Sequence, residues 1–265
     1  MDLQLQGKRA LVTGSTAGIG LAIAIQLAAE GAHVVVNGRT QKRVDDAIVA
    51  VKRDASGATV SGVAADLATR AGCETLFARV PDVDVLVNNL GIFEPKPFLE
   101  IPDEDWMRLF EANVLSGVRC SRRYLPGMIA RKWGRIVFVS SESAVQIPAE
   151  MVHYGMTKTA QAAVARGIAE SLAGTGVTCN TVLPGPTASE GVETFVDDLA
   201  KSKKQSRAEV ERDFFTHVRP TSLLRRFIDP AEVANLVAYV CSPRSSATNG
   251  ATLRVDGGVV RAVFA

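Results

Sequence analysis

Tyr154 and Lys158, four residues apart, are the side chains whose types and spacing first suggest chemistry. On a helix, residues at positions i and i+4 share a face, with Cβ atoms about 5–6 Å apart. A lysine ammonium beside a phenol stabilises the phenolate and lowers the tyrosine pKa from about 10 toward neutral pH. The pair therefore predicts a general acid–base site, although this spacing alone is common.

Polar residues follow an apolar run shortly before this pair. The run Arg135–Ser140 has the composition of a buried strand, and it leads into Ser141, Glu142 and Ser143. Folds with parallel sheets place their ligands at the carboxyl edge of the sheet. We therefore expect Ser141 to lie near Tyr154 in the same site.

A glycine-rich turn lies between the first expected strand and the first expected helix. Its sequence is Thr13-Gly14-Ser15-Thr16-Ala17-Gly18-Ile19-Gly20, a GxxxGxG spacing. Glycines allow a tight turn and a close approach to a pyrophosphate, and a helix N-terminus attracts the negative charge. The turn predicts a dinucleotide site; a purely structural turn is the alternative.

The end of the second expected strand indicates which dinucleotide binds. An acidic residue there binds a ribose 2′-hydroxyl, whereas an arginine accommodates a 2′-phosphate. This chain has Gly38 and Arg39 there and no carboxylate before Asp45. We therefore expect NADP(H) to be favoured over NAD(H), a solvated basic helix start being the alternative.

Apolar runs alternate with stretches of helical spacing along the chain. Continuous apolar runs are typical of strands buried on both faces, as in parallel sheets. The expected strands are 9–13, 33–36, 59–63, 83–87, 135–140, 177–182 and 251–255. The expected helices are 19–29, 44–52, 70–79, 104–124, 151–173 and 231–241, with Asp229 as the N-cap of the last.

This alternation predicts an α/β fold: one doubly wound, Rossmann-like parallel sheet of seven strands with helices on both faces. We find no linker and no repeat, so a single domain over residues 1–265 is expected. The polar, weakly helical stretch 185–221 interrupts the rhythm. An insertion of this length predicts a lid.

Composition excludes several classes of protein. The chain has 265 residues, 47% hydrophobic and 22% charged, which excludes disorder and disulfide-stapled folds. A net charge of +2 does not predict binding to nucleic acid or to a membrane. Four widely spaced cysteines without a CxxC pair, and no signal peptide, predict reduced thiols in the cytoplasm. The three histidines have no ligand spacing, so no metal site is expected.

Several motifs in register resemble the short-chain dehydrogenase/reductase family over essentially the whole chain, in the branch of about 250 residues that includes 3-oxoacyl-carrier-protein reductases. The matching positions are TGSTAGIG at 13–20, Asp66-Leu67, Asn88-Asn89-Leu90-Gly91, Asn113, Ser141, Tyr154-xxx-Lys158, Pro184-Gly185 and Val255-Asp256-Gly257-Gly258. Two positions depart from the pattern. Leu90 replaces the usual alanine, and Ala17 stands where many NADP-using relatives have an arginine.

The resemblance implies four catalytic residues. Tyr154 would exchange a proton with the substrate oxygen, and Ser141 would polarise the substrate carbonyl. Lys158 would hold the nicotinamide ribose and depress the Tyr154 pKa. Asn113 would anchor a water that links Lys158 to solvent, a helix-kink residue being the alternative.

The resemblance also implies a set of cofactor residues. Asp66 and the Leu67 backbone would contact the adenine, Asn88 would line the cleft, and Thr187 or Ser189 would meet the carboxamide and phosphate side. The full expected set is Gly14, Ser15, Thr16, Gly18, Ile19, Gly20, Arg39, Asp66, Leu67, Asn88, Gly91, Tyr154, Lys158, Pro184, Gly185, Thr187 and Ser189.

These features predict an NADP(H)-dependent oxidoreductase acting on a small carbonyl, alcohol or acyl-thioester substrate. The alternatives are an NAD(H)-dependent alcohol, sugar or steroid-type dehydrogenase and a non-catalytic nucleotide-binding regulator. The expected substrate wall comprises Ile92, Phe93, Gln146, Ile147, His153, Pro186 and the segment 187–215, and His153 could instead be structural. We also expect a homodimer or homotetramer formed through helices 104–124 and 151–173. The apolar residues expected there are Ala160, Ala162, Ala163, Val164, Ile168 and Leu172.

Overall fold

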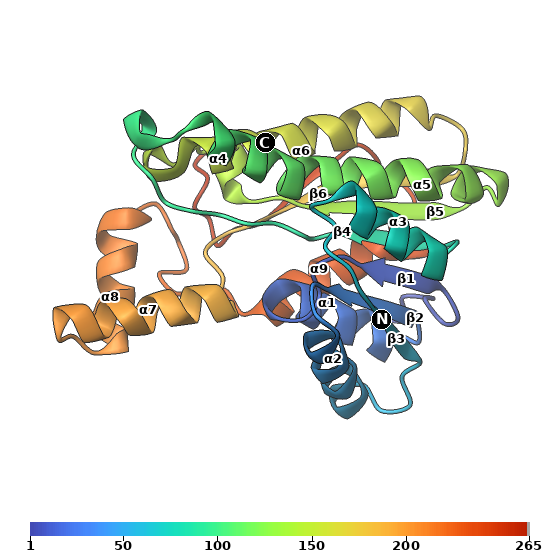
Figure 1. Cartoon of the computed structure of the whole chain (residues 1–265), viewed down its shortest axis with the longest axis horizontal. Coiled ribbons are helices and arrows are strands. Elements are labelled where there is room, and N and C mark those ends of the chain that lie inside the picture. The colour runs from blue at the N-terminus through green and yellow to red at the C-terminus, as the bar shows by residue number, and fades with distance from the viewer. Residues whose placement is uncertain (264–265) are drawn as a thin grey trace.

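The computed structural model describes residues 1–263, except the side chains of Thr194, Phe195 and Lys203. In this part of the chain seven parallel strands form one sheet (Figure 1). Their order is β3-β2-β1-β4-β5-β6-β7. The strands are β1 Arg9–Val12, β2 His33–Gly38, β3 Val60–Ala64, β4 Val85–Asn88, β5 Gly134–Val139, β6 Val177–Pro184 and β7 Thr252–Val255. The expected seven-stranded parallel sheet is confirmed, with strand ends within two residues of those predicted.

The strand order reverses beside β1, which pairs with β2 on one side and with β4 on the other. In sheets of this kind the crossovers diverge at such a point and leave a crevice at the carboxyl ends of the strands. The glycine-rich turn follows β1 directly at this point. The topology therefore places the turn where a ligand can enter.

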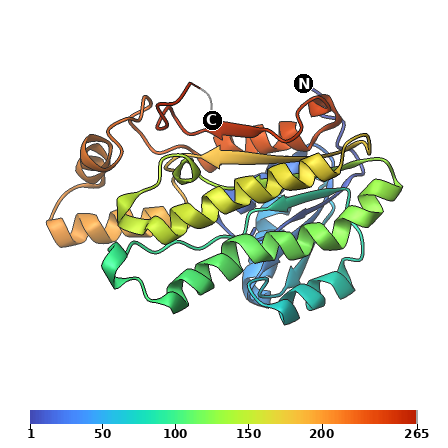
Figure 2. The same cartoon turned by 90° about the horizontal axis from the view of Figure 1, so that it is seen from above.

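Helices cover both faces of the sheet. On one face lie α1 (Gly18–Ala29), α2 (Gln41–Asp54) and α9 (Pro230–Cys241), whose apolar residues share a core with the strands. On the other face lie α3 (Arg70–Arg79), α5 (Ser116–Ala130) and α6 (Val152–Ser171), around a second core, and α5 and α6 run side by side (Figure 2). No helix in the described part of the chain is long and apolar enough to cross a membrane.

Several shorter helical segments connect these elements. They are the helix α4 (Asp103–Phe110) and the 3₁₀ turns η1 (Phe98–Glu100), η3 (Glu142–Ala144), η4 (Ala149–Met151) and η6 (Pro243–Ser245). Asp229 caps α9 as predicted, because its carboxylate accepts from the Ala231 amide while Glu232 completes a capping box. The four cysteines are buried free thiols.

The expected helix 104–124 is interrupted and longer than predicted. α4 passes into a π-helical turn, η2 (Glu111–Leu115), before α5 continues to Ala130. The predicted stop at Tyr124 is wrong because α5 runs through Pro126. The buried side chains of Tyr124 and Met128 hold the helix on the sheet, and the Tyr124 hydroxyl donates to the Val80 carbonyl at 2.9 Å.

The segment 185–221, expected to be weakly helical, contains two helices whose bounds the sequence pattern did not predict. α7 (Glu190–Lys203) and α8 (Arg207–Asp213) project from the body of the molecule, and a π-helical turn, η5 (Phe214–Val218), follows (Figure 1). Ser206 and Glu209 form a capping box at the start of α8. Among the described side chains of α7 and α8, Val196, Ala200 and Val210 form a small buried core, and Phe215 of η5 is also buried. So few buried apolar residues explain the weak apolar periodicity of the segment. We call residues 185–221 the lid.

Candidate active site

A cavity of about 580 Å³ lies at the carboxyl edge of the sheet, between the strand ends and the lid. The glycine-rich turn contributes Ile19, and the segment after β4 contributes Gly91. Ser141, Tyr154 and Lys158 line the same cavity, and the lid closes it with Val192, Leu199, Val210 and Phe214. The structure therefore brings residues from five separate parts of the sequence to one site.

Tyr154 and Lys158 lie on the first turns of α6 and share a face, as their spacing predicted. The Lys158 Nζ lies 5.5 Å from the centre of the Tyr154 ring and donates to the Val139 carbonyl at 3.2 Å. Phe93 packs edge-on against the tyrosine, with ring centres 6.1 Å apart. Lys158 is only 4% exposed, so its charge stands in a largely dry environment.

The electrostatics of this pair differ from the expectation. Burial raises the pKa of the Tyr154 phenol, and the negative charge of Glu142 raises it further, against the opposite effects of Ser141 and Arg219. Burial also lowers the pKa of Lys158 to about 8. The expected depression of the Tyr154 pKa by Lys158 is wrong for the chain by itself, because the ammonium donates to Val139 and the ring's surroundings disfavour a phenolate.

Ser141 lies two residues after the end of β5, beside a charge network that the sequence analysis missed. Its hydroxyl donates to Glu142 Oε2 and accepts from the Ser143 amide at 3.1 Å. The other carboxylate oxygen of Glu142 accepts from Arg219 Nε at 3.1 Å, and Arg219 also pairs with Glu150 at 3.0 Å. The position of Glu142, a charged residue among serines after a buried strand, could have indicated a role in the site. No sequence pattern indicated Arg219, which lies 77 residues from Glu142 in the sequence.

Asn113 lies in the π-helical turn and is completely buried. Its side-chain amide donates to Thr157 Oγ1 at 2.9 Å and to the Ile92 carbonyl at 2.9 Å, while Oδ1 accepts from the Ile92 amide at 2.7 Å. Its main-chain carbonyl accepts from Gln161 Nε2 at 2.6 Å. These bonds fix α6 and the segment after β4 relative to each other. Its expected role with a water stays a prediction.

The glycine-rich turn has the geometry of a phosphate cradle. Gly14 and Gly18 adopt left-handed backbone angles, with φ of 60° and 53°. Asn89 Nδ2 holds the turn by donating to the carbonyls of Thr13 at 3.0 Å and Gly14 at 2.9 Å. No side chain caps α1 at Ala17, so its first amides are available to an anion. These residues fit the pyrophosphate of a dinucleotide.

The expected cofactor residues at the adenosine end lie in different environments. Arg39 and Asp66 are exposed at the ends of β2 and β3, whereas the Leu67 side chain is in the core. Arg39 is next to the glycine-rich turn, because a Cβ on Gly38 would lie 2.3 Å from Thr16 Cγ2. The expectation for Asn88 is wrong for its side chain, which is buried and donates to Ser121 at 3.1 Å. Asn89 lines the cavity instead.

Leu90, the departure from the family pattern, packs against the glycine-rich turn. Its Cα lies 3.0 Å, and its Cδ1 3.4 Å, from where a Cβ of Gly14 would stand. The larger side chain therefore fills space behind the turn and belongs to the core around α3 and α5.

The start of the lid lies beside the glycine-rich turn, and the expected cofactor contacts of Thr187 and Ser189 stay a prediction. A Cβ on Gly185 would lie 2.5 Å from the Asp256 carbonyl, so only glycine fits where β6 meets the segment after β7. Thr187 Oγ1 donates to the Gly185 carbonyl at 2.8 Å. Ser189 Cβ lies 3.1 Å from the place of a Gly18 Cβ. Both side chains line the cavity together with Pro184 and Gly185.

Only some of the described residues of the expected substrate wall line the cavity, and their contact with a substrate stays a prediction. Ile92, Phe93 and Pro186 line the cavity, whereas Gln146, Ile147 and His153 do not. His153 is fully buried against Trp106, with ring centres 5.8 Å apart, and burial lowers its pKa. Among the described residues neither of its ring nitrogens has a hydrogen-bond partner. His153 is therefore a structural residue behind the site.

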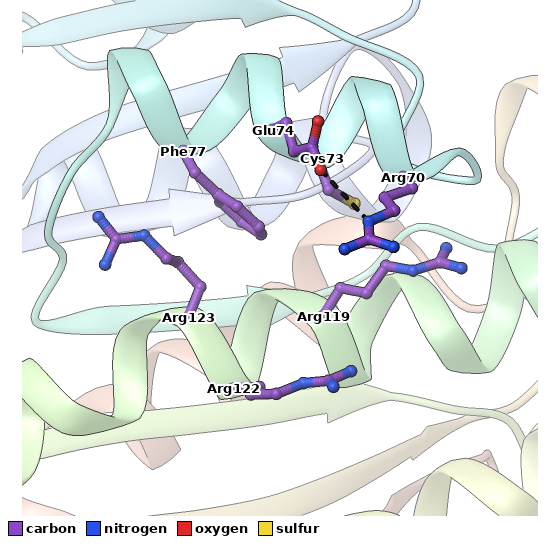
Figure 3. A pocket seen from close by; sticks show the side chains of 7 residues that line it. All are labelled: Arg70, Cys73, Glu74, Phe77, Arg119, Arg122 and Arg123. Carbon is purple, nitrogen blue, oxygen red and sulfur yellow. Dashed lines mark hydrogen bonds and ion pairs between the residues drawn. The ribbon is translucent and has the colours of Figure 1, made fainter.

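A second cavity, of about 450 Å³, lies between α3 and α5 and was not expected (Figure 3). Its walls carry Arg70, Cys73, Glu74 and Phe77 from α3 and Arg119, Arg122 and Arg123 from α5. Arg119 donates to Glu111 at 2.6 Å and to the Ala68 carbonyl at 3.3 Å. Among the described residues, this second cavity shares no lining residue with the larger one.

Comparison with known proteins gives a consistent result. The family model described as "short chain dehydrogenase" matches residues 8–200. An uncharacterized oxidoreductase of Bacillus subtilis is 51% identical over 264 residues, covering 100% of each chain. A 3-oxoacyl-[acyl-carrier-protein] reductase of Aquifex aeolicus is 31% identical, over 98% of this chain and 100% of that protein. The crystal structure of L-sorbose reductase from Gluconobacter frateurii, complexed with NADPH and L-sorbose, matches with a TM-score of 0.93 at 31% identity, over 99% of this chain and 100% of that one.

Proposed function

Because this chain belongs to the short-chain dehydrogenase/reductase family, and is therefore an NAD(P)-dependent oxidoreductase, we propose that it interconverts a carbonyl and a secondary alcohol with NADP(H), using Tyr154 as the general acid or base. One observation carries this proposal. A single cavity is lined by Ser141, Tyr154 and Lys158 and by Ile19 of the glycine-rich turn.

NADPH supplies the hydride when it is bound. In the reducing direction Tyr154 gives its proton to the substrate oxygen, so that the carbonyl becomes an alcohol. The raised pKa of Tyr154 suits this direction, because the phenol keeps its proton until one is required. Ser141 orients the carbonyl by donating a hydrogen bond, and Lys158 holds the ribose hydroxyls. Asn113 fixes the position of α6 beneath both.

The uncapped N-terminus of α1 and the turn Gly14–Gly20 hold the pyrophosphate in this proposal. Asp66 and the Leu67 backbone would contact the adenine, and Arg39 would bind the 2′-phosphate. The preference for NADPH rests on Arg39 and on the absence of an acidic residue at that strand end. The L-sorbose reductase, similar over nearly its whole length, was crystallised with the same cofactor.

The proposal is tested by measuring NADPH oxidation with a panel of ketones, hydroxy ketones and 3-oxoacyl thioesters. With any accepted substrate, Tyr154→Phe lowers kcat at least about 100-fold while NADPH affinity stays near that of the wild type, because only the proton donor is lost. The matched control is Tyr239→Phe, which removes a hydroxyl from a partly exposed tyrosine on α9. Near-normal turnover by Tyr154→Phe would refute the assignment.

A further inference from the structure

Glu142 is a buried carboxylate beside the hydroxyl that the proposed function assigns to the substrate carbonyl. The residue is 5% exposed and lines the catalytic cavity. Oε1 accepts from Arg219, and Oε2 accepts from the Ser141 hydroxyl. A charge in such a dry place is costly unless all of its acceptor positions are used.

Glu142 Oε2 loses its hydrogen-bond donor when Ser141 binds a substrate. A serine hydroxyl has one proton and can donate only one hydrogen bond. If Ser141 donates to the substrate carbonyl, it no longer donates to Glu142. Oε2 then faces the cavity as a buried, charged acceptor, and a buried acceptor without a donor weakens the complex. A substrate that brings its own donor removes this penalty.

We propose that Glu142 Oε2 accepts a hydrogen bond from a hydroxyl group on the carbon next to the reacting carbonyl, which makes uncharged α-hydroxy ketones and vicinal diols the substrates of this enzyme. This inference rests on the proposed function of Ser141 and Tyr154. The adjacent oxygens of a hydroxy ketone can contact two neighbouring groups at once. Ser141 and Glu142 are such neighbours, because their side chains are already hydrogen-bonded to each other.

The charges around the site disfavour anionic substrates. Arg219 could attract a carboxylate, but its guanidinium already pairs with Glu142 and Glu150. Asp213 adds a negative charge from the lid, while the buried Lys158 faces the tyrosine ring and Val139. A carboxylate next to the reacting carbonyl would meet Glu142 and be repelled. The charge balance therefore selects a neutral donor at this position.

The test uses three substrates with the same carbon chain: 1-hydroxybutan-2-one, butan-2-one and 2-oxobutanoate, each reduced with NADPH. In the wild type we expect kcat/KM for the hydroxy ketone to exceed that for the simple ketone at least about 100-fold, because a site built for a hydroxyl rejects an analogue that lacks it. The 2-oxo acid is the poorest of the three.

Glu142→Gln keeps the side-chain shape and removes the charge. We expect it to reduce the preference for the hydroxy ketone at least about tenfold and to raise kcat/KM for 2-oxobutanoate relative to butan-2-one. The pH at which diol oxidation reaches half its maximum also moves downward, because the negative charge that raises the Tyr154 pKa is gone. If Glu142→Gln fails to fold, the double variant Glu142→Gln/Arg219→Gln removes both charges together.

Glu170→Gln is the matched control. It neutralises a carboxylate that pairs with Arg166 on α6, from a side chain that is 65% exposed and does not line the catalytic cavity. We expect it to keep the wild-type preference and pH profile. Equal kcat/KM for the hydroxy ketone and the ketone in the wild type, or an unchanged preference in Glu142→Gln, would overturn the inference while leaving the proposed function intact. No turnover of any carbonyl in the larger panel would overturn both.

Discussion

At the scale of single residues, the catalytic pair is shaped by burial more than by mutual attraction. Lys158 carries its charge with a main-chain carbonyl as its hydrogen-bond acceptor, and Tyr154 has a phenol that resists ionisation. Burial disfavours the charged form of each side chain. A nucleotide that brings ribose hydroxyls to Lys158 would supply new acceptors, so cofactor binding and the ionisation of this pair are linked.

The pKa of Lys158 predicts a pH dependence of stability. In the unfolded chain this lysine titrates near 10.5, and in the folded chain at about 8. Between these values the unfolded chain binds more protons, so its contribution to stability rises with pH, by up to about 1.4 kcal/mol per pH unit. Urea unfolding without cofactor should show the wild type gaining stability relative to Lys158→Met between pH 7.5 and 9.5. Parallel pH profiles for the two proteins would contradict this.

Arg39 predicts the choice of cofactor. Its exposed guanidinium follows β2 beside the glycine-rich turn, where a 2′-phosphate would lie. Arg39→Ala should weaken NADPH binding by about 1.5–3 kcal/mol and leave NADH binding unchanged, because only a charge-assisted phosphate contact is lost. Fluorescence titration with both nucleotides measures this. Arg53→Ala, at the far end of α2, serves as the control, and a wild type that binds NADH and NADPH equally would argue against the assignment.

Site residues could be predicted from the sequence where they belong to a short local motif. The spacing of Tyr154 and Lys158 and the glycines at 14–20 are short-range signals, and the structure brings both to one cavity. Two adjacent asparagines could not be distinguished, because the direction of each side chain depends on how β4 ends against α5. Arg219 was out of reach because its partners come from distant parts of the chain.

At the scale of elements, the lid is attached at both ends and weakly packed between them. Thr187 pairs with Ile228 at its start, and Arg219 binds Glu142 and Glu150 near its end. Between these points α7 and α8 bury only a small apolar core of their own. The strands and the helices that cover the sheet were predictable from the spacing of their apolar residues. The bounds of α7 and α8 were not, since most of their described residues are exposed.

We predict that α7 and α8 exchange amide hydrogens readily without ligand and become protected when NADPH and substrate bind. Few buried contacts oppose local opening, and closure would exclude water from the hydride-transfer site. Hydrogen exchange followed by mass spectrometry measures this. Peptides from α9, buried against α1, provide the internal reference. Strong protection of α7 and α8 in the ligand-free protein would contradict the prediction.

At the scale of the whole molecule, α5 and α6 lie side by side on one outer face (Figure 2). The expected apolar interface is smaller than predicted, because Leu172 is buried in its own chain and Val164 and Ile168 pack against the same core. What faces outward from α6 includes Ala163 and Gly167, and a Cβ on Gly167 would meet nothing within 4 Å. Small residues on an exposed helix allow another helix to approach closely.

We therefore predict a homo-oligomer with α5 and α6 at a two-fold contact. Sedimentation equilibrium at micromolar concentration should give a multiple of 28.2 kDa. Ala163→Arg should shift the population toward monomer, because a large charged side chain would enter the contact. Val49→Arg, at an exposed position of α2 on the other face of the sheet, tests whether any new arginine has the same effect. A wild-type mass near that of one chain would remove the interface.

The packing of α9 against α1 also has a consequence for how the protein is made. Ile23 and Leu27 of α1 share a core with Val233, Val237 and Ala238 of α9, so the first helix is covered by the last one. A ribosome releases the N-terminal helix long before its cover exists, and the apolar surface of that helix stays exposed in the meantime. We predict that the chain folds as one unit only after α9 has been synthesised. Nascent chains that stop before Pro230 should therefore aggregate or bind chaperones.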